Sequence, residues 1–206
     1  MKKQTVHLFV FDTMSDWEYG YLVAGINSPV GQKAPGRFRV RTVGAADKPV
    51  KTAGGLRVLP DLALDKLKPR DSAMLVLPGG AAWDAKKNKQ AASLAGEFLS
   101  AGTPVAAICG ATAGLARAGL LDDVPHTSNS RGYLVATGYA GEACYRQKPA
   151  VRSGLLITAS AMRPLEFARE VFTALDVYDD DVLAAWYGLY KTGDAKYFEA
   201  FMRASA

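Results

Sequence analysis

The chain has 206 residues, with 25 Lys and Arg against 20 Asp and Glu, 49% hydrophobic residues, and only two Cys and two His. A chain of this length buries a full hydrophobic core in one domain, and this composition excludes intrinsic disorder, collagen and coiled coils. Because the two Cys form no Cys-x-x-Cys pair and two His cannot build a three-histidine site, we expect neither a metal nor another cofactor.

The charge pattern and the apolar runs bear on partners and location. The net charge of +5 is modest, and its densest cluster, Lys86-Lys87-Asn88-Lys89, has no interleaved aromatic residues. We interpret this cluster as a solvated helix face rather than a nucleic-acid site. The first apolar run, Val6 to Phe11, is too short for a signal-peptide core, and no run reaches membrane-spanning length. We therefore expect a cytoplasmic protein without nucleic-acid or membrane partners.

The first part of the chain alternates predicted strands with helices and turns. A strand covered on both faces is predicted over Thr5 to Phe11, because the run is almost entirely β-branched or aromatic. A helix is predicted from Asp16 to Asn27, followed by a half-exposed or edge strand over Arg37 to Val43. The pair Gly54-Gly55 predicts a hairpin turn, and another buried strand is predicted over Ala73 to Leu77.

The alternation continues to the end of the predicted sheet. Apolar residues with helical spacing begin at Ala91. A buried strand is predicted over Val105 to Ile108, a helix over Ala111 to Leu121, a strand over Leu155 to Thr158 and a helix over Pro164 to Leu175. This order predicts an α/β fold with a mostly parallel, doubly wound sheet, in which ligands bind at the carboxyl ends of the strands.

The sharpest candidate for chemistry is Cys109, which directly follows a buried strand and precedes a helix. The small residues Ala107 and Ala111 on either side fit a nucleophile elbow, in which such positions crowd each other. The helix N-terminus is expected to lower the pKa of the thiol, and the Gly110 N–H would face an oxyanion. The alternative, a small buried hydrophobe, is less favoured here, whereas Cys144 lacks this context and is interpreted as inert packing.

Other candidates lie near predicted strand ends. Gly79 and Gly80 can point backbone N–H groups into a cleft as an oxyanion hole, or form an ordinary turn. Glu18 can share a proton with a nearby thiol, or stabilise a helix dipole. His126 is a partner for Cys109 only if its loop returns to the elbow.

Taken together, these segments resemble the ThiJ/PfpI superfamily, which includes the Parkinson-associated protein deglycase, intracellular proteases and class I glutamine amidotransferase-like domains. The resemblance implies a flavodoxin-like three-layer sandwich, usually a homodimer, as a domain over residues 1–177. We interpret residues 178–206, which are rich in aromatic side chains, as a helical extension packed on the same domain. The resemblance rests on the segments Val10 to Glu18, Val76 to Gly80, Pro104 to Ala111, Gly114 to Asp122 and Gly154 to Ala168.

The resemblance also implies roles for the candidate residues. Cys109 would be the nucleophile and Glu18 the acid that hydrogen-bonds its sulfur. The N–H groups of Gly79 or Gly80, and of Gly110, would form the oxyanion hole.

One position departs from the pattern of the superfamily. An ungapped alignment of the elbow puts Asn129 where many relatives carry an active-site His, and His126 lies three positions earlier. Either the loop shifts so that His126 joins the catalytic residues, or the His role is absent and Cys109 acts with Glu18 alone.

These observations predict a cysteine-dependent enzyme that acts on a small carbonyl or amide-like group, in a small molecule or a modified protein. The activity would be of the glyoxalase or deglycase kind, or of the amidase or protease kind. The alternative is a redox-responsive stress or chaperone-like protein without turnover, with Cys109 as the oxidation sensor. A glutaminase subunit is disfavoured because Arg163-Pro164-Leu165-Glu166 lacks the His-x-Glu of that family.

Overall fold

A seven-stranded sheet forms the centre of the molecule. The computed structural model describes residues 3–205. The strand order is β5-β2-β1-β6-β7-β9-β8, and every neighbouring pair is parallel except β8 and β9. The strands are β1 (Gln4–Phe9), β2 (Phe38–Gly44), β5 (Leu62–Ala63), β6 (Met74–Leu77), β7 (Val105–Ile108), β8 (Ala150–Ser153) and β9 (Leu156–Ala159). The predicted hairpin at Gly54-Gly55 joins the separate antiparallel pair β3 (Val50–Lys51) and β4 (Arg57–Val58).

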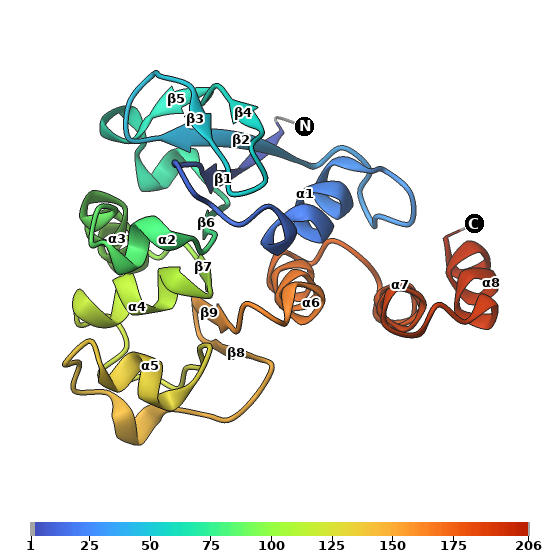
Figure 1. The fold of residues 1–206 in the computed structure, drawn as a ribbon. Helices are drawn as coiled ribbons and strands as arrows, with labels where there is room; N and C mark the ends of the chain where they lie inside the picture. The colour runs from blue at the N-terminus through green and yellow to red at the C-terminus, as the bar shows by residue number, and fades with distance from the viewer. Residues whose placement is uncertain (1–2, 206) are drawn as a thin grey trace.

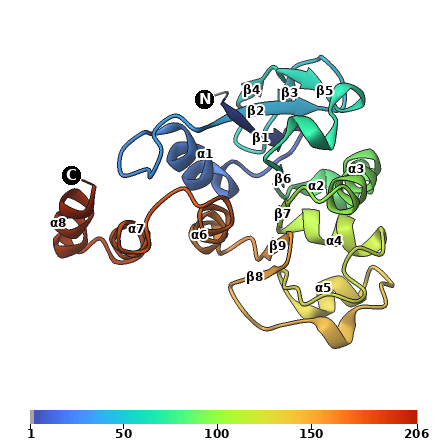
Figure 2. The same cartoon turned by 180° about the vertical axis from the view of Figure 1, so that it is seen from behind.

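Helices cover both faces of the sheet (Figures 1 and 2). On one side lie α1 (Gly20–Asn27) and α6 (Pro164–Leu175), and on the other lie α2 (Ala81–Asp84), α3 (Lys89–Ser100) and α4 (Gly110–Arg117). This arrangement confirms the predicted three-layer α/β sandwich. The remaining helices are α5 (Arg131–Val135), beyond α4, and α7 (Asp180–Thr192) and α8 (Ala195–Ala204), which extend outward from α6.

The core of the sheet consists of strands with no solvent-exposed side. Every residue of β6, β7 and β9 is buried, as expected for parallel strands that have helices on both faces. On one face α1 and α6 pack closely, because Gly25 leaves room for the ring of Phe172. Within residues 3–205, no helix is both long enough and apolar enough to cross a membrane.

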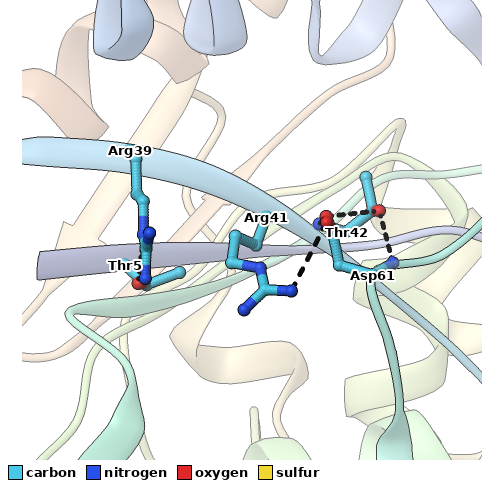
Figure 3. A network of polar contacts seen from close by, with 5 residues as sticks. All are labelled: Thr5, Arg39, Arg41, Thr42 and Asp61. Atoms are coloured by element: carbon cyan, nitrogen blue, oxygen red, sulfur yellow. Dashed lines mark hydrogen bonds and ion pairs between the residues drawn. The ribbon is translucent and has the colours of Figure 1, made fainter.

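A polar network fixes β2 in its place beside β1 (Figure 3). The Asp61 carboxylate accepts hydrogen bonds from the backbone N–H and the hydroxyl of Thr42, at 2.7 and 2.9 Å, and pairs with Arg41 at 3.5 Å. Arg39 Nε donates to Thr5 Oγ1 across the two strands at 3.3 Å. The Arg39–Thr5 bond joins β2 to β1 in the register in which these two residues lie opposite each other, whereas the Asp61 contacts join β2 to the residue before β5.

The structure differs from the predicted elements mainly in its short segments. The predicted helix from Asp16 is a 3-10 turn, η1 (Asp16–Glu18), followed by α1. The strand β2 has β5 as a further neighbour, and β8, α2 and α5 were not predicted. Segments of four or five residues are too short to show a helical period, so packing decides them.

The aromatic tail forms α7 and α8. Trp186 of α7 is buried and contacts Phe172 of α6, with ring centroids 5.0 Å apart. Tyr190 and Phe198 are about half exposed, at 52% and 53%. The tail therefore contacts the sandwich through one side of α7 and leaves part of its aromatic surface open.

Candidate active site

Cys109 occupies a strained turn between β7 and α4. Its backbone angles, φ 58° and ψ −126°, lie in a region that costs a residue with a side chain roughly 1–3 kcal/mol. The turn is held by a hydrogen bond from the Cys109 N–H to the Ala159 carbonyl, 3.0 Å, and one from the Thr112 hydroxyl to the Cys109 carbonyl, 2.6 Å. This is the predicted nucleophile elbow, at the carboxyl end of a central strand.

Glu18 reaches the elbow from η1, at the carboxyl end of β1. A backbone bridge between Met14 and Gly80 joins the loop after β1 to the loop after β6. The Gly79 N–H donates to Glu18 Oε2 at 2.5 Å. A Cβ on Gly79 would lie 2.7 Å from Cys109 Sγ and 2.8 Å from the same carboxylate oxygen. The thiol and the carboxyl therefore lie against the same glycine, as the resemblance implies for this pair.

Glu18 is buried and Cys109 is half-buried, and this burial governs how the pair titrates. Glu18 is 1% exposed, and its Oε1 has no hydrogen-bond partner among residues 3–205. Burial raises the pKa of Glu18 to about 7. Burial and the neighbouring Glu18 charge raise the pKa of Cys109 to about 12. This direction is opposite to the one expected from the helix N-terminus alone, because desolvation of two adjacent anions outweighs the dipole.

The two groups titrate as a pair rather than as independent sites. Two negative charges this close cannot both form in a buried site at neutral pH. Between the two pKa values the pair holds a single proton, which the sulfur and the carboxyl share. In the singly protonated pair, a thiol lies beside a carboxylate that can accept its proton.

The three glycines predicted to form an oxyanion hole differ in whether their backbone N–H is already hydrogen-bonded to a side chain. The Gly79 N–H already donates to Glu18. The Gly80 peptide lies next to Gly110, where a Cβ would meet Gly80 O at 3.2 Å and N at 3.4 Å. The Gly80 N–H has no hydrogen bond within residues 3–205, and the Gly110 N–H faces the Cys109 sulfur. Gly80 and Gly110 thus remain the candidates for oxyanion donors.

Asn129, not His126, contacts Cys109. Asn129 Nδ2 lies 3.5 Å from Cys109 Sγ, and its Oδ1 accepts from the Ala161 N–H at 2.9 Å. The His126 ring is buried elsewhere, with Nδ1 2.8 Å from the Val124 carbonyl and Nε2 3.1 Å from the Tyr139 hydroxyl. The structure therefore does not bring His126 to Cys109. Across residues 3–205, no three His, Cys, Asp or Glu side chains are grouped to hold a metal ion.

The loop that carries Asn129 is fixed by buried hydroxyl groups. The hydroxyls of Thr112 and Ser128 are 2.6 Å apart, which ties the loop to α4. The Thr127 N–H donates to Thr158 Oγ1 of β9 at 2.9 Å, and the Thr127 hydroxyl donates to the Lys148 carbonyl at 2.8 Å. These bonds hold the segment 127–129 in the register that directs residue 129 toward the sulfur.

Tyr133 and Asp84 lie near the site and were not among the sequence candidates. The Tyr133 hydroxyl donates to Asp84 Oδ1 at 2.6 Å. Burial, Asp84 and the nearby Cys109 raise the pKa of Tyr133 above its usual range. The bond connects α5 to α2 across the elbow. A sequence signal for α5 exists in Ser130, whose side chain caps the helix by accepting from the Tyr133 N–H.

Replacing Gly79 by Ala is expected to disrupt the site selectively. A Cβ there would lie 2.5 Å from Cys109 Cβ and closer than 3.0 Å to Glu18, so the two side chains must separate. We expect a loss of about 1–3 kcal/mol in unfolding free energy, measured by urea denaturation, and slower alkylation of Cys109. The control is Gly20→Ala, since nothing lies within 4 Å of a Cβ at Gly20. An unchanged alkylation rate in Gly79→Ala would contradict the close approach.

Known proteins resemble this chain over its whole length. The model of the DJ-1/PfpI family matches residues 4–174. The chain belongs to the DJ-1/PfpI family. A Bacillus subtilis protein named an uncharacterised protease, YoaZ, is 43% identical over 205 residues, which covers 98% of this chain and 98% of that protein. The structure of a thiJ/pfpI family protein from Bacillus anthracis superposes with a TM-score of 0.92 at 44% identity, covering 100% of this chain and 99% of that one.

A third relative carries a more specific name. A deglycase of Pyrococcus horikoshii is 43% identical over 68 residues, 32% of this chain and 41% of that protein. Relatives within the DJ-1/PfpI family are thus named both as a protease and as a deglycase. The homodimer implied by the family resemblance stays a prediction.

Proposed function

We propose that this DJ-1/PfpI family member is a cysteine-dependent enzyme that acts on a small carbonyl or amide-like group, with Cys109 as the nucleophile. The observation that carries the proposal is the strained elbow that holds Cys109 against the buried carboxyl of Glu18. Backbone strain at Cys109, and a neighbouring carboxyl whose pKa burial raises to about 7, are typical of a functional site rather than of packing. The relatives named protease and deglycase support a reaction at a carbonyl carbon.

The proposed first step is attack by Cys109 Sγ on the carbonyl carbon. The S–C bond forms as the thiol proton passes to the Glu18 carboxylate, and the carbonyl π electrons move to oxygen. The N–H groups of Gly80 and Gly110 then stabilise the oxyanion. In enzymes of this kind, the loss of one such donor typically lowers the rate by a factor of about 10²–10³. With an aldehyde, Glu18 returns the proton to this oxygen and a hemithioacetal results.

An amide-like substrate follows the same first step and then loses its amine. Glu18 gives the proton to the departing nitrogen as the C–N bond breaks, and water hydrolyses the thioester that remains. Asn129 contributes an N–H to the sulfur and holds it in place, but an amide does not relay protons. Both nitrogens of His126 are engaged away from Cys109, so the proposal gives His126 no catalytic role.

Inactivation by an alkylating agent tests the proposal. Iodoacetamide is expected to abolish turnover of methylglyoxal or of a chromogenic amide in step with modification of Cys109, followed by mass spectrometry. Bound substrate should slow the modification. Full turnover by protein whose Cys109 is completely alkylated would refute the proposal, whichever substrate is used.

A second candidate function is an oxidation sensor without turnover. It is favoured by the Glu18 carboxyl, which lies against the same glycine as the sulfur and whose Oε1 has no hydrogen-bond partner among residues 3–205, because a protonated carboxyl there can donate to a sulfinate oxygen. Mild peroxide would then oxidise Cys109 selectively over Cys144, as read by mass spectrometry. Selective oxidation with no turnover of any carbonyl or amide substrate would favour the sensor over the enzyme.

A further inference from the structure

A cavity of about 410 Å³ lies between α2, α3 and α4, and Cys109 is not among its lining residues. We name it the α3–α4 cavity. Its volume falls in the range of roughly 300–1,000 Å³ that is typical of small-molecule sites. We propose that the α3–α4 cavity binds a carboxylate that carries an apolar chain. Its lining includes Trp83, Lys86, Asn88, Lys89, Gly96 and Arg117.

The charged side chains that line the cavity are all positive. Lys86, Lys89 and Arg117 are exposed and belong to its lining, which contains no acidic residue. None of the three takes part in an ion pair within the described range 3–205. Arg117 Nη1 donates to the Trp83 carbonyl at 3.1 Å, which places its charge at the cavity without neutralising it. Three cations without an anionic partner beside one cavity repel each other, and an anion relieves that repulsion. Two of them, Lys86 and Lys89, belong to the lysine cluster whose sequence pattern predicts a solvated helix face.

The side chain of Asn88 is a second, independent observation that points to a polar ligand. It is 9% exposed and lines the cavity at the N-terminus of α3, yet its side chain does not cap that helix. Its Nδ2 is buried without a hydrogen-bond partner among residues 3–205. Leaving such a donor unpaired costs about 1–3 kcal/mol. Because Nδ2 is itself buried, the Asn88 side chain has to rotate to donate to a carboxylate at the helix N-terminus, where the helix dipole also favours an anion.

The interior of the cavity is apolar and kept open by a glycine. Gly96 lies within α3, where glycine costs about 0.5–1 kcal/mol relative to alanine. A Cβ there would meet only the Leu120 side chain, with Cδ2 at 3.4 Å and Cδ1 at 3.8 Å, so the backbone packing does not require glycine. Trp83 and Leu120 supply apolar walls. An apolar chain fits this interior while its carboxylate remains at the charged rim.

Binding of octanoate to the whole protein tests the site by titration calorimetry. We expect octanoate to bind, and acetate and 1-octanol each to bind at least about tenfold more weakly, since each lacks one half of the recognised chemistry. Measurements on the Cys109→Ser variant should give the same affinity, which separates this site from the proposed reaction. Absence of octanoate binding at millimolar concentration, or equal binding of 1-octanol, would overturn the proposal.

Three variants locate the site. Gly96→Leu fills the cavity and Lys89→Gln removes a rim charge, and each is expected to weaken octanoate binding at least about threefold. Gly96→Ala keeps the fold, because its Cβ makes an ordinary contact, and should weaken binding to a smaller extent. Lys68→Gln, an exposed lysine outside the cavity lining, is the control. Unchanged affinity in both Gly96→Ala and Lys89→Gln would show that octanoate binds elsewhere.

Discussion

Replacing Cys109 by Ser is expected to lower kcat/KM by on the order of 10³-fold or more, while the fold is retained. A serine hydroxyl is of similar size but ionises far less readily than a thiol. The variant therefore keeps the shape of the elbow and loses its nucleophile. The measurement is steady-state turnover of the substrate found for the wild-type protein.

The matched control is Cys144→Ser. Cys144 is a free, half-buried cysteine at the end of the η4 turn (Glu142–Cys144). It contributes nothing to the contacts described around Cys109, so turnover should stay within about twofold of the wild type. Retention of more than about a tenth of the wild-type activity in Cys109→Ser would contradict the nucleophilic role.

Replacing Glu18 by Gln is expected to change the pH dependence of both activity and stability. Wild-type activity should rise as the pH increases through about 7, because the carboxylate must be free to accept the thiol proton. Glutamine keeps the size of the side chain but accepts no proton, so the rise should disappear and turnover should fall about 10²–10⁴-fold. A pH–rate profile of both proteins gives this result directly.

Whereas activity is expected to rise with pH, the contribution of Glu18 to the stability of the folded protein is expected to fall with pH. The pKa of Glu18 is about 7 in the folded protein against 4.5 as the ordinary value, so the folded state binds this proton more tightly. The resulting stabilisation is complete below pH 4.5 and is lost as the pH rises through 7. Its size is about 3 kcal/mol, since one pKa unit corresponds to about 1.4 kcal/mol. Glu18→Gln should avoid this loss and gain stability relative to the wild type at pH 8.

Urea denaturation at pH 4.5 and at pH 8 measures that difference. The control is Glu97→Gln on α3, a carboxyl in none of the ion pairs of the described chain. Its stability relative to the wild type should be the same at both pH values. If the stability difference between Glu18→Gln and the wild type were also the same at both pH values, the Glu18 carboxyl would not be held protonated by burial.

The sequence was sufficient for the parts of the molecule with strong local patterns. The run over Val105 to Ile108, followed by Cys109 between small residues, predicted both the central strand and the elbow. Pro164 to Leu175 was predicted as a helix with both ends correct, because proline marks the start and the apolar face is regular. In such segments, local preference and burial favour the same structure.

Other features depended on contacts between distant segments. Whether His126 or Asn129 faces the sulfur is decided by hydroxyl bonds to α4 and β9, which no local pattern reveals. The direction of the Cys109 pKa shift was missed for a similar reason. The helix N-terminus is visible in the sequence, whereas the extent of burial and the closeness of Glu18 come from the packing of separate strand ends.

The two edges of the central sheet limit how copies of this protein can associate. The edge strand β5 has two residues and the edge strand β8 has four, with Arg152 exposed. In the part of β2 that does not pair with β5, the Val40 N–H donates to Asn27 Oδ1. Short, charged or occupied edges offer a poor template for intermolecular strand pairing and so resist aggregation. A dimer of this chain is therefore expected to form through helices and loops rather than through a continuous intermolecular sheet.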